Sequence, residues 1–339
     1  MADASVVITC FNLERYIGAA IGSVRGQEYS GEVEIIVVDD CSTDRSADVI
    51  RSFPGVRYLQ TDRNGGVLLA MLAGLEAASA AIVFFLDGDD LWEPAKLSAV
   101  MPRFAANRRL GFVTHDLICA GPGGESLDRP SRPAAAFAEL APAQFGERVR
   151  TGILEIDDYV WLGSAFAIRP SAVELDRFIA FARGLSDPAN TYQDWPLAYW
   201  IAAQDGVELD YVPAKLFRYR LHQLNYSGDA STPKRAVRNL TRTLNTNRAI
   251  LDIARMRRLP ERIVRIVEQR IGFCEYRIDL DHGRRARSVG GFLRNAGELR
   301  RRGVLKKELL RFVAVQALGP ERFARIAGRR KLLRNLPVT

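Results

Sequence analysis

Residues 81–92 have the sequence AIVFFLDGDDLW, in which an apolar run is followed directly by an acidic turn. Its first part, Ala81–Leu86, is apolar and rich in β-branched and aromatic residues, so it predicts a strand that is buried on both faces. Three carboxylates follow it within four residues, Asp87, Asp89 and Asp90. A buried strand that ends in a polar turn is typical of α/β sheets, in which ligands bind beyond the carboxyl ends of parallel strands.

The residues before this strand alternate between strand and helix patterns. Three further strands are predicted at Ser5–Cys10, Val33–Val38 and Val56–Gln60. The intervening helices are expected to follow Asn12 as an N-cap and to span Ser42–Phe53 and Gly66–Ala78. Four strands separated by helices predict a parallel sheet with helices on both faces.

The alternation weakens after Leu110. Residues 120–150 are rich in Gly, Pro, Ala and Arg, which favours a mobile excursion or lid rather than core. A helix is expected at Trp195–Gln204, followed by strands at Val207–Pro213 and Leu216–Leu221.

The charge of the chain is divided unevenly along its 339 residues. Residues 231–339 contain about 28 Lys and Arg against about 9 Asp and Glu, whereas the whole chain has 48 against 40. With a linker near Ser231–Pro233, this shift predicts a first domain at 1–230 and a basic helical region at 231–339. Four scattered cysteines without pairing or metal-ligand spacing indicate a reducing, cytoplasmic setting.

The residues after the first two strands carry polar groups that could meet a ligand. Thr9–Asn12 follows the first strand in place of a glycine-rich phosphate loop, which argues against an NAD or FAD enzyme and against a nucleotidyltransferase. A carboxylate of Asp39–Asp40, after the second strand, could accept a hydrogen bond from a nucleotide base. In the alternative interpretation, Ser42 caps the next helix and Asp44 favours its dipole.

The acidic turn after residue 86 is the sharpest feature. Its carboxylates repel one another unless a cation or water neutralises them. Such carboxylates suit Mg²⁺ or Mn²⁺, which bind through one or two protein oxygens together with substrate phosphates. The alternative is an acidic turn that caps the helix expected from Pro94.

The second half offers a base and a further ligand. Asp194 begins a predicted helix, as an N-cap or as a general base. His222 follows a predicted strand among Arg220, Asn225 and Ser227, and a neutral imidazole is a common metal ligand. The other two histidines, at 115 and 282, have no comparable setting and are interpreted as structural or surface residues.

Together these segments resemble the family-2 inverting glycosyltransferases of GT-A fold. The resemblance covers residues 5–100 and about 190–227. It rests on VVITCFN, IIVVDDCSTD, the NGG that opens a helix, FFLDGDDLW, QDW and YRLHQLNYS. It implies a Rossmann-like, mixed but mainly parallel sheet with helices on both faces, plus a C-terminal helical region. Residues 1–110 would be the nucleotide-sugar-binding half and 111–230 the acceptor-binding half.

The resemblance also implies roles in donor binding. Thr9, Phe11 and Asp40 would hold the nucleotide base and its sugar, Asp87 would contact the ribose or order the metal site, and Arg220 would meet the diphosphate or brace its loop. The family usually has Tyr where Phe11 stands, so stacking is kept and a phenol hydrogen bond is lost.

The remaining implied roles concern the metal and the transfer itself. Asp89 and His222 would ligate Mn²⁺ or Mg²⁺ at the diphosphate, Asp194 would be the catalytic base, and Trp195 would pack near the acceptor. The family usually has Glu where Gln193 stands, which leaves the role of that neighbour open.

We therefore expect an inverting glycosyltransferase that uses a nucleotide-diphosphate sugar, with UDP or dTDP as the nucleotide, in glycan or glycolipid assembly. Two alternatives stay open: a catalytically silent nucleotide-sugar-binding protein, and a nucleotidyltransferase on a related sheet. A second copy of the chain as partner is also left open.

The basic C-terminal region is predicted to form helices, among them Arg235–Arg258, Glu261–Asp279 and Lys306–Ala317. Apolar and basic residues recur at near-helical spacing around the last of these, which is typical of a helix that lies on an anionic membrane surface. The alternatives are a cap packed on the catalytic domain and a dimer contact. No nucleic-acid reader motif accompanies the charge, so nucleic-acid binding is not expected.

Overall fold

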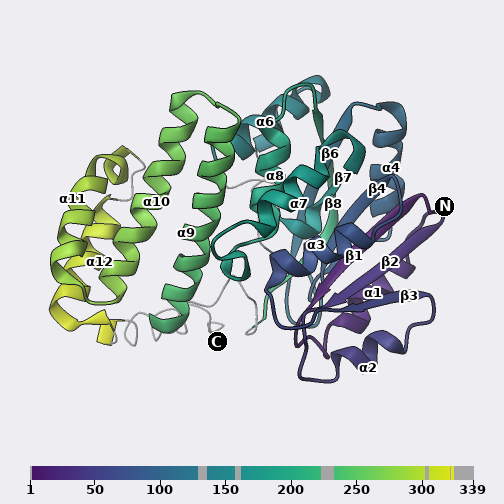
Figure 1. Cartoon of the computed structure of the whole chain (residues 1–339), viewed down its shortest axis with the longest axis horizontal. Coiled ribbons are helices and arrows are strands. Elements are labelled where there is room, and N and C mark those ends of the chain that lie inside the picture. The colour runs from purple at the N-terminus through teal and green to yellow at the C-terminus, as the bar shows by residue number, and fades with distance from the viewer. Residues whose placement is uncertain are drawn as a thin grey trace. The chain divides into compact units, whose positions relative to one another are not determined.

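The computed structural model describes residues 2–128, 136–156, 162–222, 233–301, 305–320 and 322–323. The chain divides into two compact units (Figure 1). Unit 1 comprises residues 1–222 and 252–259, and unit 2 comprises residues 223–251 and 260–339. The expected linker residues Ser231 and Thr232 lie outside the described residues, as do Asn225 and Ser227.

Unit 1 is built on one eight-stranded mixed sheet in the order β3-β2-β1-β4-β7-β6-β8-β5. The strands are β1 (Ala4–Cys10), β2 (Val33–Asp39), β3 (Val56–Gln60), β4 (Ile82–Asp87), β5 (Leu91–Trp92), β6 (Leu110–Ala120), β7 (Phe166–Ile168) and β8 (Glu208–Arg220). The first four predicted strands pair in parallel, whereas β7 runs antiparallel to both β4 and β6. The expected mixed, mainly parallel sheet with the first four strands in parallel is therefore confirmed.

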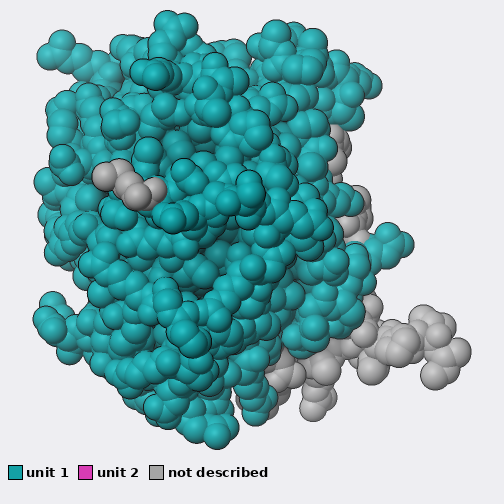
Figure 2. All heavy atoms as spheres, turned by 90° about the vertical axis from the view of Figure 1, so that its right-hand side faces the viewer, with its two compact units in different colours: residues 1–222, 252–259 teal, residues 223–251, 260–339 magenta. Residues whose placement is uncertain are grey.

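Helices cover both faces of this sheet. They are α1 (Ile17–Arg25), α2 (Ser46–Arg51), α3 (Val67–Ala77), α4 (Lys96–Ala106), α6 (Phe145–Leu154), α7 (Leu175–Arg183) and α8 (Asp194–Ala202). Alternation along β2 explains the arrangement, because neighbouring side chains point to opposite faces. Val37 packs in the core that includes the apolar side of α1, whereas Ile36 and Val38 pack against α3. Figure 2 shows one face of unit 1 in space-filling form.

Two expected helix starts are wrong. Asn12 takes a left-handed backbone conformation (φ 54°), and α1 begins five residues later at Ile17. Ser42 does not cap α2 either, since its hydroxyl accepts a hydrogen bond from the backbone N–H of Asn12 at 2.9 Å. The N-cap of α2 is Arg45, and Asp44, one residue earlier, accepts with its Oδ1 from the N–H of Ser46 at 2.9 Å.

The expectation of a lid over residues 120–150 is wrong for its second half. Phe137 and Phe145 are buried, and the ring of Phe137 stacks on Tyr211 of β8 with centroids 3.9 Å apart. Residues 129–135 lie outside the described part of the chain. The two strands expected at 207–213 and 216–221 form the single strand β8, in which Pro213 is exposed.

Unit 2 consists largely of helices, as expected. They are α9 (Pro233–Met256), α10 (Glu261–Asp281), α11 (Arg285–Arg301) and α12 (Leu305–Leu318), with the last five residues of α9 assigned to unit 1. The core of unit 2 contains Tyr276, Phe292 and Val315. Among the described residues, no helix is both long enough and apolar enough to cross a bilayer.

Candidate active site

The sheet brings the ends of β1 and β4 together. Thr9 is the register partner of Asp87, and its hydroxyl donates to Asp87 Oδ1 at 3.4 Å. The next residue, Gly88, donates its N–H to the Thr9 carbonyl oxygen at 2.9 Å. A Cβ at Gly88 would lie 2.7 Å from that oxygen. The acidic turn therefore requires glycine at this position, because the two backbones approach so closely.

The acidic turn is held in place by buried partners. Ser164 Oγ accepts from the N–H of Asp87 at 3.0 Å and donates to Asp90 Oδ2 at 2.7 Å. Asp90 Oδ1 also accepts from the backbone N–H of Arg220 at 2.9 Å. Burial and the neighbouring carboxylates hold the pKa of Asp90 well above its usual range. Asp90 thus ties the turn to β8 and to Ser164 and is directed away from solvent.

Asp89 and His222 meet across the end of the sheet. Asp89 Oδ2 lies 3.0 Å from His222 Nε2. The ring of Tyr16 lies against the imidazole with centroids 4.4 Å apart, and the Arg220 guanidinium sits over the same Tyr16 ring at 4.8 Å. Sequence reasoning missed Tyr16, because this residue precedes α1 in a turn whose sequence carries no signal of the contact.

Asp194 lies beside the acidic turn. It is the first residue of α8, not its N-cap, and its carboxylate accepts from the N–H of Trp195 at 2.9 Å and of Gly163 at 3.2 Å. Burial raises the pKa of Asp194 to about 7, an effect that the two N–H groups partly oppose. A Cβ at Gly163 would lie 3.8 Å from Asp194 Cβ and 3.9 Å from Asp87 Oδ1. The side chains of Asp194 and Asp87 therefore both lie close to Gly163.

Gln193 and Trp195 flank this base. Gln193 Nε2 donates to Asp87 Oδ1 at 3.0 Å. Burial, followed by the charges of Asp89 and Asp194, raises the pKa of Asp87 to about 8. A neutral amide donor at position 193 thus satisfies a carboxylate that a glutamate would repel. The rings of Tyr192 and Trp195 have centroids 6.1 Å apart at the start of α8.

The expected base-binding residues differ in exposure. The side chain of Phe11 is 42% exposed just beyond β1. The Asp40 carboxylate is buried and accepts from the N–H groups of Gly65 and Gly66 at 2.9 and 2.7 Å and from the Thr61 hydroxyl at 2.9 Å. Asp40 therefore fixes the glycine loop. Gly66 has φ 83° and a Cβ there would collide with the Ala189 carbonyl, so the close approach of the two backbones requires glycine at this position.

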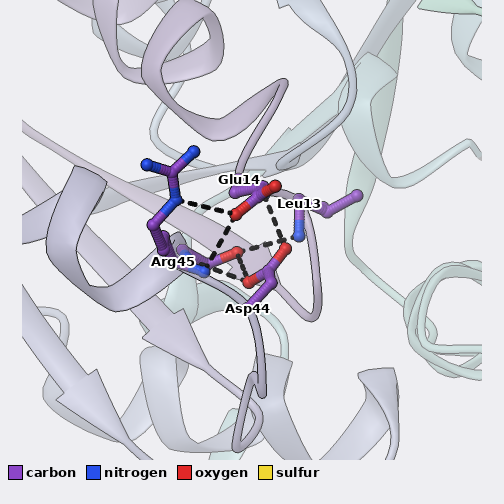
Figure 3. A network of polar contacts seen from close by, with 5 residues as sticks. Leu13, Glu14, Asp44 and Arg45 are labelled. Carbon is purple, nitrogen blue, oxygen red and sulfur yellow. Dashed lines mark hydrogen bonds and ion pairs between the residues drawn. The ribbon is translucent and has the colours of Figure 1, made fainter.

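A second polar network joins the loops after β1 and β2 (Figure 3). Asp44 Oδ2 accepts from the N–H of Glu14 at 3.0 Å, and Glu14 Oε2 accepts from the N–H of Arg45 at 3.1 Å. The N–H of Leu13 donates to Ser46 Oγ at 2.9 Å. These reciprocal bonds fix the loop that begins with Phe11 to the loop after β2.

The donor set at the acidic turn fits a divalent ion. Within the described residues, no three or more His, Cys, Asp or Glu side chains gather as a metal cluster. Asp89 and His222 nevertheless offer a carboxylate oxygen and an imidazole nitrogen at one point. Two protein ligands suffice for Mg²⁺ or Mn²⁺ when substrate phosphates complete the coordination.

Comparison with known proteins places this site in context. The family model described as glycosyl transferase family 2 matches residues 5–132. An uncharacterized glycosyltransferase of Nostoc sp. is 36% identical over 139 residues, 40% of this chain and 42% of that protein. The putative teichuronic acid biosynthesis glycosyltransferase TuaG of Bacillus subtilis is 30% identical over 129 residues, 37% and 50% of the two chains. The succinoglycan biosynthesis protein ExoO of Rhizobium meliloti is 34% identical over 142 residues, which are 41% of this chain and 38% of that protein. The matches thus span half or less of these relatives.

Solved structures extend the likeness to most of the chain. S. aureus TarS 1–349 in complex with UDP-GlcNAc superposes with a TM-score of 0.56 at 15% identity, covering 89% of this chain and 92% of that one. The mannosyltransferase PcManGT from Pyrobaculum calidifontis, in complex with GDP-Man and Mn²⁺, superposes with a TM-score of 0.51 at 16% identity, covering 98% of this chain and 87% of that one. At these identities the likeness concerns the fold.

Proposed function

We propose that this chain is an inverting hexosyltransferase that uses a nucleotide-diphosphate sugar, because the model of glycosyl transferase family 2 matches residues 5–132. The proposal rests above all on one observation: a buried carboxylate, Asp194, whose pKa burial raises to about 7, lies beside the acidic turn at the end of β4. The acceptor is a hydroxyl of a growing glycan or of a lipid-linked sugar. Relatives named for teichuronic acid and succinoglycan biosynthesis support a place in polysaccharide and cell-envelope assembly.

The reaction is a single displacement at the anomeric carbon through an oxocarbenium-like transition state. Asp194 takes the acceptor hydroxyl proton as that oxygen attacks, and a base is most effective when its pKa is near the working pH. The N–H groups of Gly163 and Trp195 orient its carboxylate. The acceptor packs against Trp195, and Gln193 keeps Asp87 in place.

The donor lies along the carboxyl ends of β1, β2 and β4. Phe11 stacks on the base, and Thr9 and Asp40 hold the base and its sugar, with Asp40 acting in part through the Gly65–Gly66 loop. Asp87 faces the ribose. The donor is a UDP- or dTDP-sugar, a choice that the UDP-GlcNAc complex of TarS favours. Residues 1–110 thus serve the donor, residues 111–230 the acceptor, and 231–339 form a separate basic region.

Asp89 and His222 hold Mn²⁺ or Mg²⁺. When bound, this ion supplies positive charge that stabilises the departing diphosphate. Arg220 adds a further positive charge near the diphosphate and, through Tyr16, braces the imidazole of His222. The Mn²⁺ complex of PcManGT supports a divalent ion in this fold.

The first experiment is thermal stabilisation by UDP, dTDP, GDP and CDP, each with Mn²⁺, with Mg²⁺ and without metal. A ligand that binds the folded state raises its stability by mass action, by about 2.7 kcal/mol at a hundredfold excess over Kd. We expect a metal-dependent shift with UDP or dTDP that disappears in Asp89→Ala. Asp176→Ala, which removes an exposed carboxylate on α7, is the control and should keep the shift.

Product analysis separates the remaining candidate functions. Transfer releases a nucleoside diphosphate and a new glycoside, whereas a nucleotidyltransferase would release pyrophosphate and a silent binding protein would release nothing. No stabilisation by any nucleotide with either metal would overturn the proposal at its centre, because the acidic turn would then be structural.

We also propose that the enzyme works in the cytoplasm at the inner face of the membrane, where a lipid-linked acceptor is accessible. All four cysteines are free thiols, as a reducing compartment would keep them.

A further inference from the structure

Helices α11 and α12 of unit 2 pack side by side and run antiparallel. The rings of Phe292 and Phe312 stack with their centroids 5.1 Å apart. Gln316 Nε2, one turn further along α12, donates at 2.9 Å to Ser288 Oγ, one turn back along α11. These contacts fix which face of each helix is directed toward its neighbour and which is left outside.

The outside of α12 is apolar. Glu308 and Arg311 form ion pairs with α10, and Phe312 contacts α11, so the opposite side of α12 is directed away from both helices. Helical spacing places Leu310 and Val313 on that side. Their side chains are 64% and 55% exposed.

The neighbouring helix extends this surface. Leu309 lies on the α11 side of α12, because residues three and seven positions later contact α11. On α11, Val289 and Leu293 each follow a residue that contacts α12, and Leu293 is 67% exposed. We call these five residues the outer apolar face: Val289, Leu293, Leu309, Leu310 and Val313.

Basic residues lie at one end of the outer apolar face. Because the helices are antiparallel, the end of α11 meets the start of α12, which brings exposed Arg300, Lys306 and Lys307 to the same end. Over residues 260–339 the chain has 20 Lys and Arg against 8 Asp and Glu. An exposed apolar face beside strong positive charge matches a surface that is apolar inside and anionic outside.

We propose that the outer apolar face docks unit 2 on an anionic lipid bilayer. Leucine and valine side chains enter the interface, while Arg300, Lys306 and Lys307 contact lipid phosphates. A neutral protein surface would gain nothing from the positive charge, and a second copy of this basic unit would be repelled by it. The proposal concerns unit 2 by itself and does not depend on the chemistry proposed for unit 1.

The test is co-sedimentation of the full chain with phosphatidylcholine vesicles that contain or lack phosphatidylglycerol. We expect binding to the anionic vesicles, weaker binding as salt rises, and little binding to phosphatidylcholine alone. The affinity of the double variant Leu310→Glu/Val313→Glu for the anionic vesicles should be at least about tenfold lower, because two apolar side chains no longer enter the interface.

Leu318→Glu is the matched control, since Leu318 is also exposed on α12 (42%) but lies on the side opposite Leu309. It should keep wild-type binding. Circular dichroism checks that each variant folds, and the nucleotide-dependent thermal shift should be the same in all of them, so that failure of docking is distinguishable from failure of the transferase proposal. Absent binding to anionic vesicles, or equal binding by the double variant, would overturn the proposal. The proposal would also be overturned if the wild type were a dimer and the double variant a monomer, because the face would then be a contact between two copies.

Discussion

The protonation state of Asp194 sets the pH range in which the proposed displacement can run. Its carboxylate is buried, and burial favours the neutral acid, which raises its pKa to about 7. A neutral acid cannot accept a proton from the acceptor hydroxyl. Activity is therefore present above the pKa and is lost as the pH falls through about 7.

We predict that kcat of the wild type rises with pH and levels off above this pKa. Asp194→Asn keeps the shape of the side chain but removes the base, so kcat should fall by roughly 10²- to 10⁴-fold and lose the acidic limb. Nucleotide affinity should be retained. Initial-rate profiles over pH check both points, with Asp176→Asn as the control that changes neither. If Asp194→Asn kept the acidic limb of the pH–rate profile, the base would be another residue.

Phe11 carries a second prediction at this scale. Its ring is exposed, so Phe11→Ala should change the free energy of unfolding by no more than about 0.5 kcal/mol. If the ring stacks on the base, the same change weakens UDP binding, since aromatic stacking on a base contributes about 1–3 kcal/mol. Titration calorimetry with UDP and Mn²⁺ measures the loss, and Phe11→Tyr should preserve affinity. Unchanged affinity in Phe11→Ala would place the base elsewhere.

At the scale of elements, the acidic turn depends on backbone contact between the ends of β1 and β4. We predict that Gly88→Ala displaces the turn, because its Cβ would lie 2.7 Å from the Thr9 carbonyl oxygen, and backbone cannot yield as a side chain does. The melting temperature should fall and the nucleotide-dependent shift should disappear.

The matched control is Gly22→Ala in α1, where no heavy atom lies within 4 Å of the added Cβ. Alanine inside a helix is favoured over glycine by about 0.5–1 kcal/mol, so this variant should melt at the same or a higher temperature. Loss of nucleotide binding in the control as well would point to global instability and contradict the local explanation.

At the scale of elements, sequence periodicity predicts the positions of strands and helices but not the contacts between distant segments. The strand expected at 81–86 lies at Ile82–Asp87, and the helix expected at 261–279 lies at Glu261–Asp281, because burial patterns are local. Asn12 and Ser42 misled the prediction of caps, because they bond across the gap between two loops. Tyr16 beside His222 and Phe137 on Tyr211 are contacts between distant segments, which a single sequence does not reveal. The proposed roles of the site residues stay predictions.

At the scale of the whole molecule, each unit has a hydrophobic core of its own. Two cores joined by few chain crossings favour two unfolding transitions over one. A nucleotide with Mn²⁺ should raise the transition of unit 1, because it binds there, and leave that of unit 2 unchanged.

For a variant in unit 2 we predict the converse, a change in the transition of unit 2 and none in that of unit 1. Gly291 lies where α11 crosses α10, and a Cβ there would be 3.0 Å from Tyr276 Cβ. Gly291→Ala should lower the transition of unit 2 while the nucleotide-dependent shift of unit 1 is retained. Gly297→Ala on the same helix, with no heavy atom within 4 Å of its Cβ, is the control and should lower neither. Differential scanning calorimetry measures both transitions in one experiment. A single transition that UDP with Mn²⁺ and Gly291→Ala both move would mean that the two cores unfold together, so that a ligand in the acidic turn also stabilises the basic helices.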